Sequence, residues 1–328
     1  MNLLTILGLS GPWLAGCLAL ACIRKLQRQS AHPGRLFRLL GYGFFLGYAL
    51  LYGLILANQA FAGQVQVLPV MIVLLALIMI GAGIMVSPAR SGLPDAATRK
   101  IATSAVQSAG GGWLKGILLA WIALHLVFAL ANVLSIPMFP WDSWLLWMYR
   151  AKAWFYHGGL AEITGPEQWI TASGVPPYTV DAYSYPTFLS VIGFWVSLCL
   201  GRWSETLVNL PGILCGLAIA CSLYGHALKL GLSSVIALCL CYLLVSTPLF
   251  ATHMSLGGYS DLWMAGYAGL GFVALISGLE TRKPSYTAIG LILLCVSALV
   301  KNEGFVWLIM GLALIFLMRV PARIQLES

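Results

Sequence analysis

The chain has 328 residues, of which 60% are hydrophobic and only 9% are Asp, Glu, Lys or Arg. Soluble domains carry about 25% charged residues. The composition therefore excludes a soluble enzyme, a nucleic-acid-binding protein and a disordered chain, even though the net charge is +8. It predicts a polytopic membrane protein built from α-helices. All eight cysteines lie in apolar runs without a CxxC pair, which is typical of small buried residues.

Nine apolar runs are long enough, or nearly so, to cross a bilayer. They occupy residues 3–23, 37–61, 67–87, 113–136, 206–227, 233–252, 262–279, 285–300 and 305–320. Because a crossing helix needs about 20 residues, the helices formed by the last two runs should extend into the neighbouring residues at their ends. The sequence thus predicts an all-α transmembrane bundle of about nine spans.

The run 187–201 is a short span or a re-entrant half-helix, and the distribution of Lys and Arg separates these alternatives. If the run does not cross, 14 of the 18 basic residues lie on one side of the membrane. The four basic residues on the other side are then Arg150, Lys152, Arg202 and Lys301. If the run does cross, the division becomes 11 to 7. We therefore expect a re-entrant run, an outward N-terminus and an inward C-terminus.

The acidic residues, which did not enter that choice, also divide unevenly between the two faces. Seven of the ten fall on the outer face in this topology: Asp142, Glu162, Glu167, Asp181, Glu205, Asp261 and Glu303. One alternative is that acidic residues simply occupy loops, the largest of which is outside. This alternative applies best to Glu162, Glu167 and Glu205, which have no special sequence context.

The longest outer segment, 137–186, begins with an aromatic stretch of helical period over residues 141–157. Its four tryptophans, at 141, 144, 147 and 154, would share one helix face. Such a stripe predicts an amphipathic helix lying in the headgroup layer. Asp142 points to the opposite face, where its carboxylate either caps the helix or takes part in chemistry.

The rest of this segment, 158–186, is rich in Gly, Pro and Tyr, and the sequence predicts an ordered loop. The tyrosines at 178, 183 and 185 would either stack on sugar rings or lie at the membrane interface. The residues themselves favour neither interpretation.

Two further outer loops carry charged residues. In THMSLGGYSDLW (252–263), Asp261 follows a Gly-Gly pair that permits close backbone approach, and His253 is nearby. The alternative is that Ser260-Asp261 only begins a helix. In VKNEGFVW (300–307), Lys301 and Glu303 lie between two short apolar runs. Charges at membrane depth are candidates for a functional site, although a local ion pair closing the turn is the alternative.

Together, the pieces WDSW, RAKAWF, YSYP, GGYSD and VKNEG resemble the GT-C superfamily of polytopic glycosyltransferases. The likeness is greatest to the bacterial branch related to protein O-mannosyltransferases and lipid A aminoarabinose transferases, and it covers about residues 113–320. It implies a GT-C-like catalytic membrane module over 113–328, including the outer loop 137–186. Residues 1–112 would then form an N-terminal segment of three membrane helices with basic cytoplasmic loops.

The resemblance implies transfer of a sugar, with inversion, from a polyprenyl-phosphate donor to an acceptor hydroxyl on the non-cytoplasmic face. Asp142 matches the catalytic base and Asp261 the acidic residue of the second loop. Lys301 matches the lysine near the carrier phosphate, with Arg150 or Lys152 as further phosphate ligands. The residues expected at the acceptor or sugar are Tyr183, Tyr185, His253 and Glu303.

Two departures from the family pattern bear on these roles. Relatives often carry Lys-Pro-Pro at the end of the first loop, where this chain has Tyr185-Pro186-Thr187, so phosphate contact from that loop would fall to Arg150 or Lys152. Many relatives have an Asp-Glu pair where this chain has Asp142 followed by Ser143.

The expected partners are the donor lipid, membrane lipids and a partner membrane subunit, with no nucleic acid. A divalent cation, Mg or Mn, could be held by Asp142 and Asp261, although no clustered ligand signature is present.

The expected location is a bacterial inner membrane with a periplasmic active site. The alternative functions are a non-catalytic membrane subunit and a lipid or glycan transporter, but a transporter usually has two related halves and polar residues at mid-membrane.

Overall fold

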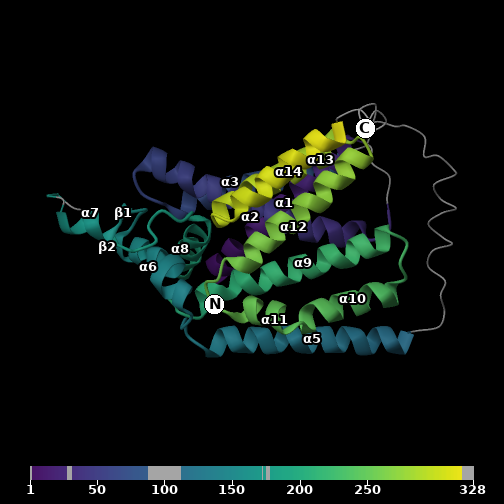
Figure 1. Ribbon diagram of the computed structural model, residues 1–328, viewed down its shortest axis with the longest axis horizontal. Helices are drawn as coiled ribbons and strands as arrows, with labels where there is room; N and C mark the ends of the chain where they lie inside the picture. Colours follow the sequence, from purple (N-terminus) through teal and green to yellow (C-terminus); the bar gives the residue numbers. More distant parts are fainter. Residues whose placement is uncertain (1, 28–31, 88–111, 172, 175–177, 320–328) are drawn as a thin grey trace, which may run out of the picture.

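The chain is a multi-pass membrane protein with an all-α helical bundle (Figure 1). The computed structural model describes residues 2–27, 32–87, 112–171, 173–174 and 178–319. The long helices are α1 (Leu3–Leu26), α2 (Arg35–Ala62), α3 (Val67–Val86), α5 (Gly112–Ser135), α9 (Leu210–Lys229) and α12 (Asp261–Glu280). The shorter helices are α6 (Met148–His157), α7 (Pro166–Thr171), α8 (Phe188–Leu200), α10 (Ser234–Ser246), α11 (Pro248–Ser255), α13 (Pro284–Val300) and α14 (Gly304–Arg319).

Among the described residues, six helices are long and apolar enough to cross a membrane. The pair α10 and α11, bent by 65°, would make a seventh span. The runs predicted at 285–300 and 305–320 form α13 and α14, which have only 17 and 16 residues. These helices are short because the VKNEG turn interrupts the apolar sequence. The polytopic helical bundle is therefore confirmed, but the expected count of nine spans is not.

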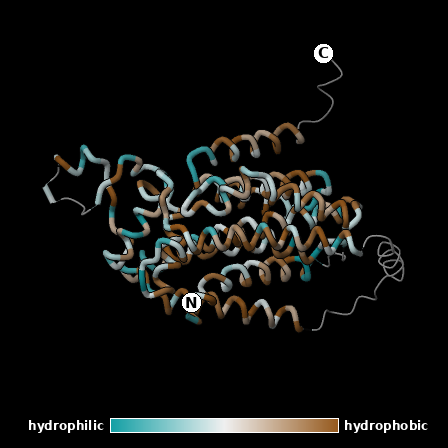
Figure 2. The backbone as a smooth tube through the Cα atoms, turned by 90° about the horizontal axis from the view of Figure 1, so that it is seen from below, coloured by the Kyte–Doolittle hydropathy of each residue, from teal (hydrophilic) through white to brown (hydrophobic). Residues whose placement is uncertain are grey.

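The long helices differ in how much of their surface lies inside the bundle. About half of α1, α2, α9 and α12 is buried, and these helices pack against one another at the centre. By contrast, α3 and α5 bury little and expose large apolar side chains along their length. Figure 2 shows the hydrophobic colouring running along the helices and the more hydrophilic segments gathered toward their ends. An apolar outer surface of this kind is what a lipid environment requires.

Helices α1 and α2 approach closely because glycines line their contact. Gly43 and Gly47 in α2 are four residues apart and face α1. A methyl group at Gly47 would collide with the carbonyl oxygen of Pro12, and one at Gly16 would collide with that of Gly43. Small residues at this spacing let membrane helices pack backbone to backbone.

We expect Gly47→Ala to separate α1 from α2 and to lower stability by about 1–3 kcal/mol, the usual cost of overpacking. Gly53→Ala is the matched control, since it lies in the same helix and a methyl group there would meet nothing within 4 Å. Thermal unfolding of both variants in detergent measures the difference. Equal melting temperatures would contradict close packing at this crossing.

The short helix α8 is attached to α6 on both of its flanks. Before α8, Arg150 of α6 donates hydrogen bonds of 2.6 Å to the carbonyl oxygens of Ala182 and Tyr185. After α8, Lys152 of α6 pairs with Glu205 at 2.8 Å. Since both flanks return to one short helix, the chain enters and leaves α8 on the same side of the bundle. The side chains of α8 are buried almost throughout.

The segment predicted as an ordered loop without regular elements, 158–186, contains three short regular elements in its described part. Strands β1 (Ile163–Thr164) and β2 (Tyr178–Thr179) pair in parallel, and α7 lies between them in the sequence.

The described cysteines are free, and five of the eight are buried, as the apolar runs indicated.

Candidate active site at the end of the bundle

The aromatic stretch at 141–157 does not form one uninterrupted α-helix. It begins as a π-helix, η1 (Ser143–Trp147), and continues as α6. The wider π turn changes the register of the side chains. Trp147 and Trp154 are buried at 1% and 5% exposure, whereas Trp141 and Trp144 are 66% and 47% exposed. The predicted stripe of four tryptophans in the headgroup layer is therefore wrong, because two of them pack inside the protein.

Asp142 precedes this π-helix and is half-buried. Its side chain forms no capping hydrogen bond. Across the described part of the chain, its carboxylate has no hydrogen bond or ion pair. The helix-capping alternative is therefore wrong, and the carboxylate is free to accept a proton or a hydrogen bond from a ligand.

The Gly-Gly pair in the loop before α12 holds that loop against the start of the π-helix. Gly258 has a φ of +77°, and a methyl group there would collide with Oγ of Ser143. A methyl group at Gly257 would collide with the amide of Asn209, at the end of the 3-10 helix η2 (Leu207–Asn209). The predicted close approach is confirmed, and it brings Tyr259 next to the Asp142 segment.

Asp261 is the first residue of α12 and pairs with a lysine from a distant part of the chain. Nζ of Lys301 donates a hydrogen bond of 2.9 Å to Oδ1 of Asp261. The local partner expected from the sequence, Glu303, is also present, but its Oε1 lies farther away at 3.5 Å. Burial alone would lower the pKa of Lys301, but the hydrogen bond and the charge of Asp261, with help from Glu303, raise it above 10.5. Lys301 is therefore a cation at neutral pH.

Charges from three separate loops meet around Tyr259. Burial raises the pKa of Tyr259, and the negative charges of Asp142 and Asp261 raise it further, while Lys301 lowers it. These charges therefore lie close to the phenol ring. The His253 ring packs edge-on against the same phenol at 5.9 Å between centroids.

We call this group of outer residues the Tyr259 cluster. Its members are Asp142, His253, Tyr259, Asp261, Lys301 and Glu303. A narrow cavity beneath it is lined by Asn209, His253 and Tyr259 together with apolar side chains of α8, α9 and α12. The cluster brings together five of the nine residues predicted for the site. Tyr259 itself is new, although it lies inside the GGYSD motif.

No family model, curated protein or solved structure matches this chain. The likeness to GT-C enzymes therefore depends on the motifs in the sequence.

Arg150 has a structural role and is not available to a donor phosphate in this arrangement. Its side chain is 1% exposed, and its two terminal nitrogens are bound to the carbonyls before α8. Burial lowers the pKa of Arg150 to about 10, so it is still a cation at neutral pH. In place of the expected phosphate binding, Arg150 holds the YSYP loop (183–186) against α6.

Replacing Arg150 with Gln should loosen the outer segment. Hydrogen bonds to a charged group are worth about 1.5–3 kcal/mol each, and Gln cannot reach both carbonyls. We expect a lower melting temperature and faster proteolysis within residues 158–186. Arg202→Gln removes an exposed arginine from the loop after α8 and should change neither. Unchanged proteolysis in the Arg150 variant would contradict the structural role.

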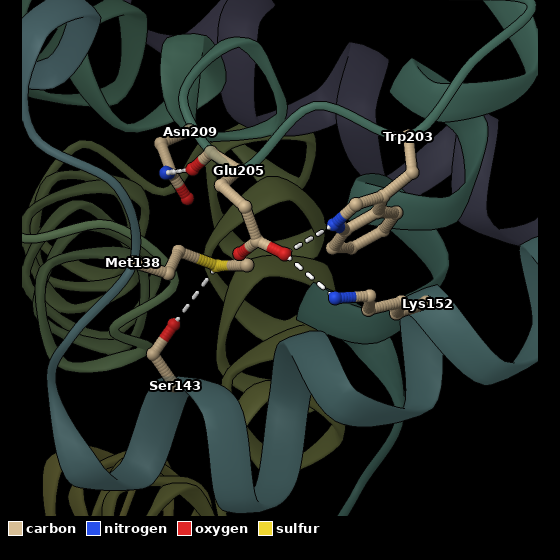
Figure 3. A network of polar contacts seen from close by, with 6 residues as sticks. All are labelled: Met138, Ser143, Lys152, Trp203, Glu205 and Asn209. Carbon is tan, nitrogen blue, oxygen red and sulfur yellow. Dashed lines mark hydrogen bonds and ion pairs between the residues drawn. The ribbon is translucent and has the colours of Figure 1, made fainter.

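Lys152 belongs to a separate polar network that sequence reasoning missed (Figure 3). Glu205 Oε1 accepts hydrogen bonds from Lys152 at 2.8 Å and from the indole of Trp203 at 2.7 Å. The amide of Asn209 donates to the backbone carbonyl of Glu205 at 2.8 Å. Glu205 is thus a central acceptor, although its neighbours in the sequence do not single it out. The only available signal was its position two residues after a tryptophan at the end of an apolar run.

The tyrosines predicted to contact sugar lie apart from the Tyr259 cluster in the described contacts. The Tyr185 ring packs edge-on against Trp147 at 6.2 Å, and its carbonyl binds Arg150. Tyr183 is 44% exposed and lies over Gly165. The structure gives Tyr185 a packing role and leaves Tyr183 on the surface of the outer segment.

A divalent-cation site would need several carboxylates that are free to bind the metal. The described residues contain no group of three or more His, Cys, Asp or Glu that could hold a metal ion. Asp261 and Glu303 both face the ammonium group of Lys301. A divalent cation held by Asp142 and Asp261, the predicted ligands, would have to displace Lys301 from Asp261. These residues therefore do not fit a metal, and we derive no step through one.

An open groove of about 560 Å³ lies between α5 and α11, beside the Tyr259 cluster. Half of its lining residues are apolar: Phe128, Ala129, Ala131, Ile136 and Ala251. Its polar lining residues are His125, Asn132 and Ser135 from α5, with Thr252 and Ser255 from α11. Ser255 is four residues from Tyr259, and Ser135 is seven residues from Asp142, so the groove leads toward the cluster.

Proposed function

We propose that this protein is a membrane glycosyltransferase of the GT-C type. It would transfer a sugar from a polyprenyl-phosphate donor to an acceptor hydroxyl, with inversion. The observation that carries this proposal is the Tyr259 cluster. Three loops far apart in the sequence bring an unpaired carboxylate, Asp142, into the neighbourhood of a lysine held by Asp261.

In the proposed reaction, Asp142 is the general base. The acceptor oxygen attacks the anomeric carbon from the face opposite the phosphate, and its proton passes to the Asp142 carboxylate. The bond between the anomeric carbon and the phosphate oxygen breaks, and the electron pair leaves with the lipid phosphate. General bases of this kind contribute about 10²–10⁴-fold to the rate.

Lys301 would stabilise the departing phosphate. An ammonium group has three donors, and Asp261 and Glu303 engage two of them. The third is left for a phosphate oxygen, and a charge-assisted hydrogen bond in a half-buried site stabilises developing negative charge. Asp261 is then a positioning residue that orients Lys301.

The groove between α5 and α11 would hold the lipid chain of the donor. Half of its lining residues are apolar, and α5 is largely exposed along the bundle surface, so a chain could enter sideways from the bilayer. The 65° bend between α10 and α11 lies beside this groove, because α11 forms one of its walls.

The proposed topology has nine crossings, in which α10 and α11 form one broken span and α13 and α14 are short spans. Helix α8 would be re-entrant, and α6 would lie near the membrane interface. The positive-inside rule places the Tyr259 cluster on the non-cytoplasmic face, which in a bacterial inner membrane is periplasmic.

The direct test supplies the purified protein, in lipid nanodiscs, with a panel of polyprenyl-phosphate sugars labelled in the sugar. Transfer of label to an acceptor, with release of polyprenyl phosphate, is the expected result. If reconstituted vesicles move the donor across the bilayer without releasing the phosphate, a transporter is indicated. If the protein only restores activity to a second membrane subunit, the non-catalytic alternative is indicated.

A further inference from the structure

A second narrow cavity lies at the opposite end of the bundle from the Tyr259 cluster. It is enclosed by α1, α2, α9, α12 and α13. Its polar lining side chains are Arg24, Arg38, Tyr42, His226, Lys229, Ser277 and Tyr286. We call it the arginine cavity. Nothing in the proposed transfer reaction uses these residues.

The two arginines of this cavity are almost completely buried. Arg24 is 5% exposed and Arg38 is 3% exposed. The Nε atom of each is buried without a hydrogen-bond partner. Buried guanidinium groups normally have a partner, because an uncompensated buried charge is strongly destabilising.

The neighbouring charges add to this cost. Arg24, Arg38 and Lys229 lie close enough to interact electrostatically, and Arg35 and Lys283 are also near. The nearby carboxylate is Glu280, which is exposed, acts on Lys229 and does not line the cavity. Within the described ranges, no salt bridge joins any of these cations to a carboxylate.

The backbone around Arg38 also favours an anion. Arg35 and Arg38 lie at the start of α2, where the helix dipole disfavours a positive side chain and favours a negative group. Arg24 lies in the last turn of α1, where a cation is favoured. The polar side chains of Tyr42 and His226 are paired with each other at 3.1 Å, so they do not compensate the arginines.

We propose that the arginine cavity binds the phosphate group of an anionic ligand through Arg24, Arg38 and Lys229. A phosphate would supply the missing acceptors for both guanidinium groups and would offset three like charges at once. The cavity lies at the end of the helices where α1 and α9 finish with basic residues, and Lys229 is exposed there. Its volume is about 10 Å³, so a phosphate would have to widen it from the Lys229 side. Basic pockets between membrane helices at this level bind phospholipid headgroups, and a soluble phosphate would present the same chemistry.

The test uses the full chain in nanodiscs of phosphatidylcholine, with or without phosphatidylglycerol, and separately with inorganic phosphate. Native mass spectrometry measures bound phosphatidylglycerol, and thermal unfolding measures stabilisation. We expect Arg24→Gln and Arg38→Gln each to weaken phosphatidylglycerol binding about fivefold. Lys229→Gln, at an exposed position, should also weaken binding and carries little risk to folding. Lys115→Gln removes a cation that does not line the cavity and should change nothing.

In phosphatidylcholine alone, the arginine variants should be at least as stable as the parent, because a buried charge without a partner has been removed. Stabilisation of the parent by phosphatidylglycerol only would identify a lipid headgroup, and stabilisation by inorganic phosphate would identify a soluble ligand. The proposal is overturned if neither stabilises the parent, or if Lys115→Gln loses as much binding as the arginine variants. It is also overturned if the arginine variants unfold more readily in phosphatidylcholine alone.

Discussion

Asp142→Asn should lower sugar transfer by about 10²–10⁴-fold, the usual contribution of a general base. The amide is nearly the same size as the carboxylate but cannot take the acceptor proton. Because the Asp142 side chain has no hydrogen bond or ion pair to the described residues, the substitution should leave the melting temperature unchanged. Loss of activity without loss of stability is the expected signature.

The matched control is Asp181→Asn, which changes an exposed carboxylate in the same outer segment. It should retain full activity. Single-turnover transfer from a labelled donor, with unfolding followed on the same preparations, separates chemistry from folding. Near-normal turnover by the Asp142 variant would remove Asp142 from the mechanism and would favour the non-catalytic alternative.

Lys301→Met should lower transfer by about 10²–10³-fold, the loss seen when one preorganised donor to a developing negative charge is removed. Methionine keeps the length of the side chain but donates nothing to the phosphate. Asp261 and Glu303 would lose their shared cation, so some loss of stability should accompany the loss of activity.

Lys152→Met is the control for this prediction. Lys152 is 47% exposed and is already paired with Glu205 outside the Tyr259 cluster, so its loss should cost little activity. Asp261→Asn should have an intermediate effect, because Lys301 keeps its charge but loses its closest partner. If Lys152→Met were the more damaging change, the phosphate would have to bind beside Glu205.

The sequence predicted the site largely through motifs at the ends of apolar runs. Asp142, Asp261, Lys301, Glu303 and His253 were all assigned from local context. The structure brings four of them to one phenol ring and pairs Glu303 with Lys301. Scarcity of charge made this possible, since few ionisable residues lie outside the basic loops. The residues that were missed carry only weak local signals: Tyr259 lies inside the GGYSD motif, and Glu205 follows Trp203 by two positions.

Two errors share a physical cause. Helical periodicity placed four tryptophans on one face, but one π turn changed the register and buried two of them. Arg150 was assigned to phosphate because of its charge, but its reach to two backbone carbonyls before α8 decided its role. Both outcomes depend on segments that pack against α6 but lie far from it in the sequence.

The amino-acid sequence by itself determined that this chain is a polytopic helical membrane protein, because hydropathy and charge depend on composition along the chain. Only the tertiary structure decided which charges meet. Asp261 and Lys301 are 40 positions apart, yet their helix ends converge. In the sequence, Arg24 and Arg38 are two of the basic residues that orient the chain in the membrane. The packing of five helices buries them together. Burial and pairing are properties of contacts between distant segments, and these decide whether a charge orients the chain or binds a ligand.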